Sequence, residues 1–173
     1  MYLDDALLYN QGYMISINDL DSPLFYLFDY DSRSFKINMS FQHFHQFHEI
    51  HILLSGRASH IIEGDYYTLQ PYDIVLLRPS LLHKTEYPSG GDCRRLIINF
   101  RVPDDSPVLH EMLQSCLQPF GAEVPIYRFT GETRAQAFSH LNEIFTLGKQ
   151  PMTPLTQQFI HCHFLQFLAT VAQ

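Results

Sequence analysis

Cysteine is scarce in this sequence, and the few cysteines lie far apart. Cys93, Cys116 and Cys162 are the whole set, an odd number with no CxxC pair among them. A disulfide-stapled fold or a cysteine-based zinc ribbon needs cysteines paired at short spacing, so the sequence favours neither class. We therefore expect reduced thiols and a cytoplasmic protein.

Long apolar runs are missing as well. A helix that crosses a bilayer needs about 20 consecutive apolar residues, and no run in this chain approaches that length. The first ten residues, MYLDDALLYN, are acidic and lack the basic start of a secretory signal. The sequence predicts no membrane partner.

Basic residues are also few. The chain has 11 lysines and arginines against 18 aspartates and glutamates, a formal net charge of −7. A nucleic-acid-binding surface needs clustered cations that displace counterions from the phosphates. We therefore expect any contact with DNA to be made by residues outside this chain.

The first part of the chain, up to about Phe100, is a series of short strands broken by turns. With 173 residues and 46% apolar residues, the chain can form one compact domain or a barrel with a helical appendage. The predicted strands are residues 24–29, 34–41, 49–54, 58–62, 66–69, 74–77 and 94–101, with one more around 126–129. Many short strands at this spacing are typical of a β-sandwich or β-barrel.

After Phe100 the apolar residues recur at helical spacing. Ser106-Pro107 and Thr153-Pro154 each have the form of an N-cap followed by proline at the first helical position. Another helix is expected from about Thr130 to Gly148. The last helix has more apolar residues than one packed face requires, which predicts a homodimer, although burial between its neighbour and the sheet is an alternative. The expected dimer interface consists of Phe159, Ile160, Phe164, Phe167 and Leu168.

The most specific pattern is a cluster of histidines in HFHQFHEIHILLSG, which begins at His43. In a strand, His43 and His45 point to the same face because they are two residues apart. Glu49 follows, and His83 comes later at the end of PSLLH. Three imidazoles and a carboxylate on neighbouring strands suit a divalent transition metal such as Zn, Fe, Ni or Mn. The alternative is a hydrogen-bonded cluster that lines a pocket without a metal.

This order of residues, H-x-H-x3-E-x6-G and later P-x3-H, resembles the two motifs of the cupin superfamily. The stretches HFHQFHEIHILLSG, YTLQPYDIVLLRPSLLH and RRLIINF resemble the N-terminal domains of AraC-type transcription regulators, over roughly residues 20–173. The resemblance implies a cupin-type double-stranded β-barrel (jelly roll) followed by an antiparallel helix pair. Tyr72 stands in place of the usual glycine before Asp73, and Leu81 in place of a glycine frequent in cupin enzymes. Both departures move the sequence away from the enzymes while leaving every candidate ligand in place.

The resemblance also implies how the chain is divided. An N-terminal arm over residues 1–20 would be able to fold over a ligand, a barrel over 21–130 would bind an effector, and the helices over 131–173 would dimerise. In that family a DNA-reading helix-turn-helix domain follows, so we expect one beyond Gln173, with a free-standing cupin as the alternative. The implied partners are a small-molecule effector, a second copy of the chain and, through the further domain, DNA.

Several other residues are pocket candidates. His51 shares the strand parity of Glu49 and is expected to face the pocket, whereas His48 has the opposite parity and is expected on the outer face. His60 is a further candidate. Arg95 is a candidate for clamping an acidic effector, with an exposed strand arginine as the alternative. The histidines of the predicted helices are expected at the surface or at an interface: His110, His140, His161 and His163.

Three functions are compatible with this sequence. The leading hypothesis is the effector-sensing and dimerisation domain of a bacterial AraC-type regulator, which is not an enzyme. The alternative is a metal-dependent cupin enzyme of the dioxygenase or isomerase class, with the ion held by His43, His45, Glu49 and His83. A third is a cupin that only stores or presents a small molecule. A Ser-His-Asp order, a phosphate-cradling glycine loop and a nucleophilic cysteine context are all absent from the sequence.

Overall fold

The computed structural model describes residues 12–33, 38–103 and 105–173. The chain forms two compact units, which are described separately. One consists of Gln11–Val102 and Val124–Arg128, and the other includes Pro103–Glu123 and Phe129–Gln173. Among the described helices, none combines the length and the apolar character needed to cross a membrane.

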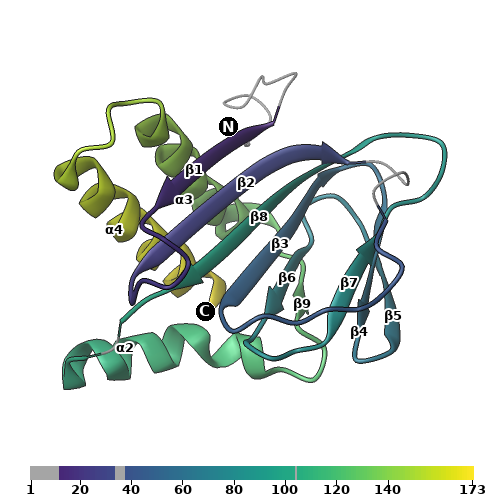
Figure 1. Ribbon diagram of the computed structural model, residues 1–173, viewed down its shortest axis with the longest axis horizontal. Helices are drawn as coiled ribbons and strands as arrows, with labels where there is room; N and C mark the ends of the chain where they lie inside the picture. Colours follow the sequence, from purple (N-terminus) through teal and green to yellow (C-terminus); the bar gives the residue numbers. More distant parts are fainter. Residues whose placement is uncertain (1–11, 34–37, 104) are drawn as a thin grey trace. The chain divides into compact units, whose positions relative to one another are not determined.

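The first unit is a barrel of two antiparallel sheets (Figure 1). The larger sheet has the strand order β1-β2-β8-β3-β6-β9, and the smaller has the order β5-β4-β7. In chain order the strands are β1 (Tyr13–Ile17), β2 (Phe25–Arg33), β3 (His48–Ser55), β4 (Ala58–Ile62), β5 (Asp65–Leu69), β6 (Ile74–Leu77), β7 (His83–Glu86), β8 (Cys93–Arg101) and β9 (Ile126–Tyr127).

Residue alternation along β3 decides which side chains face the interior between the sheets. Leu53 belongs to a buried apolar cluster with residues of β4, β5, β6 and β8, so its parity points inward. Glu49 and His51 share this parity, and the strand register places them beside Asn99 and Ile97 of β8. The opposite face of β3 is apolar and also buried. Glu49 and His51 are thus polar exceptions in a strand that is otherwise apolar between its ends.

Several turn residues of the barrel have a left-handed backbone, among them Gly56 and Tyr72. Gly56, between β3 and β4, has a φ of +85°, and a Cβ there would lie 2.9 Å from Cys93 Sγ, so the turn requires glycine. Tyr72 has a φ of 72° and its amide donates to the Leu53 carbonyl at 2.6 Å. The tyrosine therefore keeps the conformation for which glycine is favoured, at a cost of about 1–2 kcal/mol.

The second unit is helical. It contains α2 (Pro107–Leu117), the 3-10 turn η2 (Gln118–Gly121), α3 (Gly131–Gly148) and α4 (Pro154–Val171). Both predicted caps are confirmed, since Ser106 Oγ accepts from the Leu109 amide and Thr153 Oγ1 from the Thr156 amide, each at 3.1 Å. Helices α3 and α4 lie side by side (Figure 1).

Most side chains of the expected dimer interface are buried in the single chain. Ile160, Phe164, Phe167 and Leu168 have no exposed surface, because the apolar stripe of α4 is buried within its own chain. Phe159 is 49% exposed and is the one member of that set that a second copy can contact. The homodimer itself remains a prediction.

The structure also differs from the predicted strands and boundaries. Residues 38–41 of the expected strand 34–41 form no strand, and residues 34–37 lie outside the described part. Strands β1 and β7 were not predicted. Because β1 pairs with β2, the barrel unit includes part of the expected arm, and residues 1–11 of that arm, with their expected role as a lid, lie outside the described residues. Helix α2, assigned to the barrel by sequence, belongs to the helical unit.

Candidate functional site

The predicted histidine cluster forms where the segment before β3 runs beside β7. His43 and His45 lie in this connecting segment and not on a regular strand as expected. His43 is nevertheless tied to β7, because its backbone exchanges two hydrogen bonds of 2.9 Å with His83. The Ser80 amide donates to the His45 carbonyl at 2.8 Å. Backbone pairing therefore fixes both histidines against the strand that carries the third.

All four predicted residues come together. One ring nitrogen from each of His43, His45 and His83 lies within 4.8 Å of the others. Glu49 Oε2 lies 3.0 Å from His45 Nε2, and Glu49 Oε1 lies 3.9 Å from His83 Nε2. The carboxylate is thus on the same side of the cluster as two of the imidazoles.

The backbone fixes the tautomers of two of these rings. His83 Nδ1 lies 2.8 Å from the Leu81 carbonyl oxygen, and His45 Nδ1 lies 3.0 Å from the Phe47 carbonyl oxygen. Because a carbonyl oxygen only accepts, each Nδ1 carries a proton, and each neutral ring has its lone pair on Nε2. His83 Nε2 is buried with no hydrogen-bond partner. A backbone bond to the second ring nitrogen is typical of histidines that ligate metals.

The contact between His45 and Glu49 requires a cation. The Nε2 lone pair and a carboxylate oxygen repel each other at 3.0 Å unless a proton or a metal ion lies between them. Burial raises the pKa of Glu49, but the hydrogen bond with His45 and the charges of the surrounding imidazoles outweigh burial and lower the pKa overall. Burial lowers the pKa of His83, against the attraction of Glu49, which keeps that lone pair available at neutral pH.

These donors fit a divalent transition metal. Three imidazole nitrogens and one carboxylate are the ligands that Zn, Fe, Ni or Mn accept, and the unpartnered His83 Nε2 is a lone pair that a cation would satisfy. His43, His45, Glu49 and His83 would hold the ion. When bound, it would supply Lewis-acid polarisation of a ligand oxygen. Without it, the same residues form a hydrogen-bonded cluster that shares one proton between His45 and Glu49.

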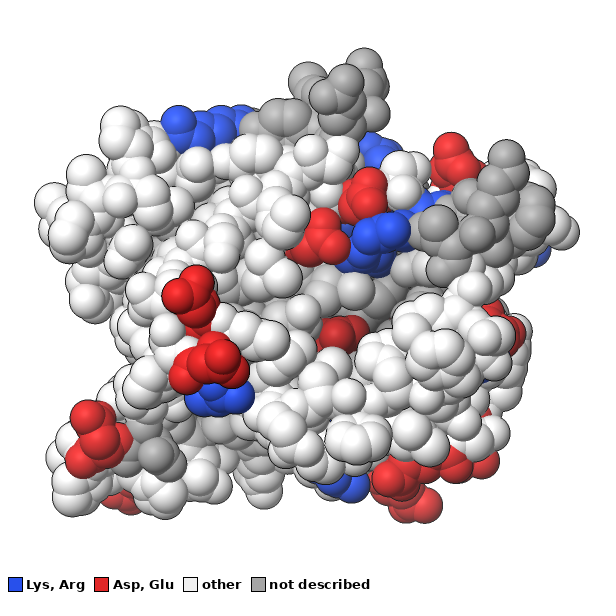
Figure 2. Space-filling model, in the orientation of Figure 1, with Lys and Arg blue, Asp and Glu red and all other residues white. Residues whose placement is uncertain are grey.

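A cavity of about 250 Å³ opens beside the cluster. Figure 2 shows a hollow in this face of the molecule, with acidic atoms inside it and both acidic and basic atoms along its rim. The described residues that line the cavity are Arg33, Met39, His43, Glu49, His83, Thr85, Tyr87, Arg95 and Ile97. The cavity therefore combines part of the predicted cluster with the predicted Arg95.

Arg95 lies in the cavity wall and is only 4% exposed, unlike the exposed arginine of the alternative interpretation. Its Nη2 donates to Asp29 Oδ2 at 2.9 Å and its Nη1 to the Asp29 carbonyl at 3.2 Å. The aspartate on β2 thus holds the guanidinium at the wall. Burial of this charge is tolerated because it is paired.

A second pair of histidines lies deeper in the barrel. His51 and His60 have no exposed surface, and their ring centroids are 5.1 Å apart. Burial lowers the pKa of His51 to about 4 and that of His60 well below its ordinary value. Both rings are therefore neutral at pH 7. His51 points inward as its parity predicts, but it does not line the cavity.

His48 has the opposite parity and stacks on Phe100, with ring centroids 5.2 Å apart. Sequence reasoning missed Arg33, which lines the cavity from the end of β2. The predicted strand stopped at residue 29, whereas β2 continues to Arg33. Asp29 and Asp31 alternate with the buried Phe28 and Tyr30, and this alternation was the signal that extends the strand beyond residue 29.

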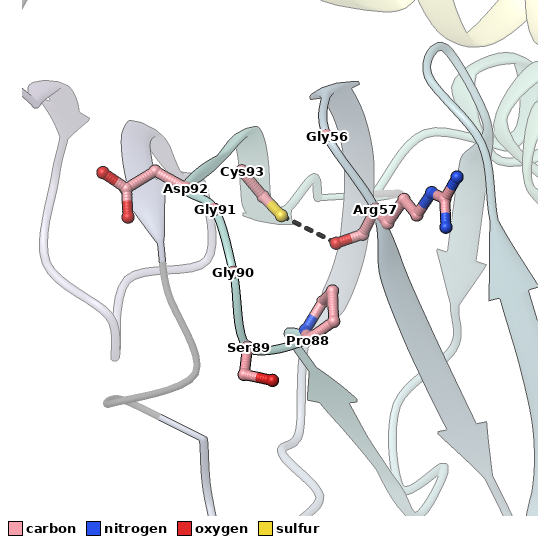
Figure 3. Close-up of a pocket in the computed structure, with 8 residues that line it drawn as sticks. All are labelled: Gly56, Arg57, Pro88, Ser89, Gly90, Gly91, Asp92 and Cys93. Carbon is pink, nitrogen blue, oxygen red and sulfur yellow. Dashed lines mark hydrogen bonds between the residues drawn. The ribbon is translucent and has the colours of Figure 1, made fainter.

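Another hollow, of about 290 Å³, lies beside the turn at Gly56. Figure 3 shows that the Arg57 guanidinium and the Asp92 carboxylate point away from it. The Cys93 thiol donates a hydrogen bond to the Arg57 carbonyl oxygen at 2.7 Å. The two charged side chains of this lining are therefore directed away from the hollow, whereas Arg95 lies in the wall of the other cavity.

Comparisons with solved structures return cupin proteins with weak overall superposition. A cupin protein from Bacteroides fragilis is 19% identical, over 57% of this chain and 84% of its own, with a TM-score of 0.45. A conserved barrel domain protein from Salinispora arenicola is 17% identical, over 58% and 78%, with a TM-score of 0.41. The salicylate 1,2-dioxygenase from Pseudoaminobacter salicylatoxidans is 12% identical, over 45% and 22%, with a TM-score of 0.39. No curated protein matches the chain.

Two antiparallel sheets that enclose a cavity, with a His/Glu cluster at its wall, define a cupin-type ligand-binding barrel. The family model for the AraC-like ligand binding domain matches residues 36–144, which is more than half of the chain. The chain belongs to this family. The predicted family and the predicted fold class are confirmed.

Proposed function

We propose that this chain is the effector-sensing and dimerisation domain of an AraC-type transcription regulator. The observation that carries the proposal is the cavity inside the barrel of an AraC-like ligand binding domain. Its wall combines apolar side chains, such as Ile97 and Met39, with convergent polar groups, the composition typical of small-molecule sites.

In this proposal the effector acts by favouring one arrangement of the protein. Arg95 and Glu49 are fixed from different strands, so a ligand that contacts both is held by two parts of the sheet. An effector shifts the protein only as far as its affinities for the two arrangements differ. The net charge of −7 is unfavourable for DNA, so DNA contact is assigned to residues outside this chain.

Exposed apolar residues on the helices support a homodimer. Val108 and Met112 on α2 are 71% and 61% exposed, and Leu155 and Phe159 on α4 are 64% and 49% exposed. Each pair is spaced four residues apart, so its members lie on one helix face. The proposed interface thus uses these four side chains in place of the buried stripe of α4.

The sensing role is tested by measuring the melting temperature of the 173-residue chain against a library of sugars, diols, aromatic compounds and organic acids. A true effector raises the melting temperature in a concentration-dependent manner, and it changes the DNA affinity of the complete regulator. Sedimentation equilibrium tests the dimer, with Phe159→Ser expected to weaken it and the exposed Tyr66→Ser in the barrel as control. A library without any stabilising compound contradicts the sensing role.

A metal-dependent cupin enzyme is the second candidate, and the convergence of three imidazoles and Glu49 favours it. Metal analysis of the purified chain and oxygen uptake with small hydroxy and dihydroxy compounds separate the two candidates. Iron-loaded protein that consumes oxygen with a diol, and loses this activity in Glu49→Gln, would overturn the purely regulatory role.

A further inference from the structure

The lining of the cavity is richer in basic side chains than the chain as a whole, and both of its arginines are paired with aspartates of β2. The chain carries a net charge of −7, yet the described lining residues include two arginines and a single acidic residue, Glu49. Glu49 is already engaged by His45 at 3.0 Å. Arg33 and Arg95 are themselves paired with Asp31 and Asp29 of β2, so this end of the cavity offers a ligand the guanidinium N–H groups that those pairs do not use.

These arginines have donors that the described residues leave unused. Arg33 Nε is buried and has no hydrogen-bond partner among the described residues, while its Nη2 lies 3.1 Å from Asp31 Oδ2 and 3.8 Å from Asp29 Oδ2. Arg95 gives two hydrogen bonds to Asp29, out of the five N–H groups of a guanidinium. A buried donor without a partner costs about 1–3 kcal/mol, so an acceptor at this wall is favoured.

The volume limits the size of the occupant. A cavity of about 250 Å³ corresponds to roughly eight waters at about 30 Å³ each, so it admits a molecule of about eight to ten non-hydrogen atoms. Ile97 and Met39 provide apolar contact, and Thr85 and Tyr87 add hydroxyl groups to the wall. A larger ligand would extend out of the cavity, which is open to solvent.

We propose that the cavity binds a small organic acid whose carboxylate docks on the guanidinium groups of Arg33 and Arg95. The rest of the ligand extends toward His43 and His83. A guanidinium fork matches a carboxylate with two parallel hydrogen bonds, which a neutral amide or a sugar hydroxyl does not reproduce. This inference rests on the proposed function, since it names the class of effector that the same cavity takes.

The test compares carboxylates with the neutral amides of the same shape. Isothermal titration calorimetry and thermal shift are measured on the chain with lactate, succinate and benzoate, and with lactamide, succinamide and benzamide, after removal of metals and again with added zinc. At least one acid is expected to bind ten or more times as tightly as its amide. Its affinity is expected to fall as the salt concentration rises.

Two substitutions locate the site. Arg95→Gln and Arg33→Gln are each expected to weaken binding of the acid at least tenfold, whereas Arg57→Gln, whose guanidinium points away from the neighbouring hollow (Figure 3), leaves it unchanged. Circular dichroism checks that each variant is folded. If Arg95→Gln does not fold because Asp29 is left without its partner, Arg95→Lys keeps the charge and removes the fork, and it too should bind the acid more weakly.

Neutral compounds that bind as tightly as acids, or acid binding that survives in both folded arginine variants, would overturn this inference while leaving the sensing role intact. A chain that binds no compound of any class contradicts both. The two failures are therefore distinguishable.

Discussion

Two groups of histidines lie in one barrel and differ in what their ring nitrogens contact. His45 and His83 each donate from Nδ1 to a backbone carbonyl, so their Nε2 lone pairs have a fixed direction. His51 has neither ring nitrogen bonded within the described residues, and His60 has only a 3.4 Å contact from Nδ1 to Thr85. The first group has the orientation that a cation would require, whereas the second is held by packing and by one long contact of His60 with Thr85. Residue type and burial alone therefore do not distinguish the two groups, whereas a backbone bond to the second ring nitrogen, typical of metal ligands, does.

The second group, His51 and His60, should make the folded state less stable at acidic pH. His51 and His60 stay neutral in the folded chain, since burial lowers the pKa of His51 to about 4 and that of His60 well below its ordinary value. In the unfolded chain both bind a proton below about pH 6.5. The unfolded state then binds more protons, so the free energy of unfolding falls as the pH drops from about 6.5 to 4, by about 3 kcal/mol for His51 alone.

Urea titrations between pH 7.5 and 4 measure this loss. The slope of the free energy of unfolding against pH is expected to be smaller in His51→Gln, by the equivalent of about one bound proton. His110→Gln on α2 serves as a control. A slope that is the same in wild type and His51→Gln would show that His51 is already satisfied, for example by buried water, and would remove the contrast between the two groups.

The first group, which contains His45 and His83, should bind zinc through Nε2. His83→Gln removes one ligand and is expected to weaken zinc binding about 100-fold or more, since even the loss of an outer-shell partner typically costs 10–100-fold. His60→Gln, one layer deeper, should leave zinc affinity within about threefold. Competition with a chromogenic chelator at pH 7.5 measures both. Zinc binding that is absent from the wild type identifies the first group as a hydrogen-bonded cluster that shares a proton.

Replacement of a histidine by leucine should change the free energy of unfolding in opposite directions in the two groups. His51→Leu removes unpartnered polar atoms from an apolar interior and is expected to raise the free energy of unfolding by about 1 kcal/mol. His83→Leu leaves the Leu81 carbonyl without its donor and is expected to lower it by about 1–3 kcal/mol. Chemical denaturation at pH 7.5, where both histidines are neutral, provides the comparison. Destabilisation by both substitutions to the same extent would contradict it.

Sequence spacing was sufficient for much of this site. Apolar runs predicted β3 and β6, because strands buried on both faces leave a continuous signal. β4 and β8 were predicted from their β-branched, aliphatic and aromatic residues, and their burial alternates along most of their length. Serine or threonine before proline located two helix starts, since capping is a local interaction. The four cluster residues were predicted through their resemblance to a known motif, and the structure places them together.

What the sequence did not predict depends on distant contacts. Strand β7, HKTE, is polar and becomes a strand only by pairing with β4 and, through His83, with His43. Arg33 reaches the cavity because β2 extends along β8 as far as Cys93. The apolar stripe of α4 was taken for an interface because an apolar face looks the same in a sequence whatever covers it. Each of these features is decided by a partner far away in the chain.

The buried thiol of Cys93 can report on the opening of the barrel wall. It is buried against Gly56 and donates to the Arg57 carbonyl, whereas Cys116 is partly buried and Cys162 is exposed. Cys93 borders the hollow beside Gly56 but is only 2% exposed, so a thiol reagent reaches its sulfur fully only when this part of the barrel wall opens. The rate of Cys93 labelling therefore reports how often the barrel wall opens. The labelling rate of Cys162 in the same molecule provides the reference.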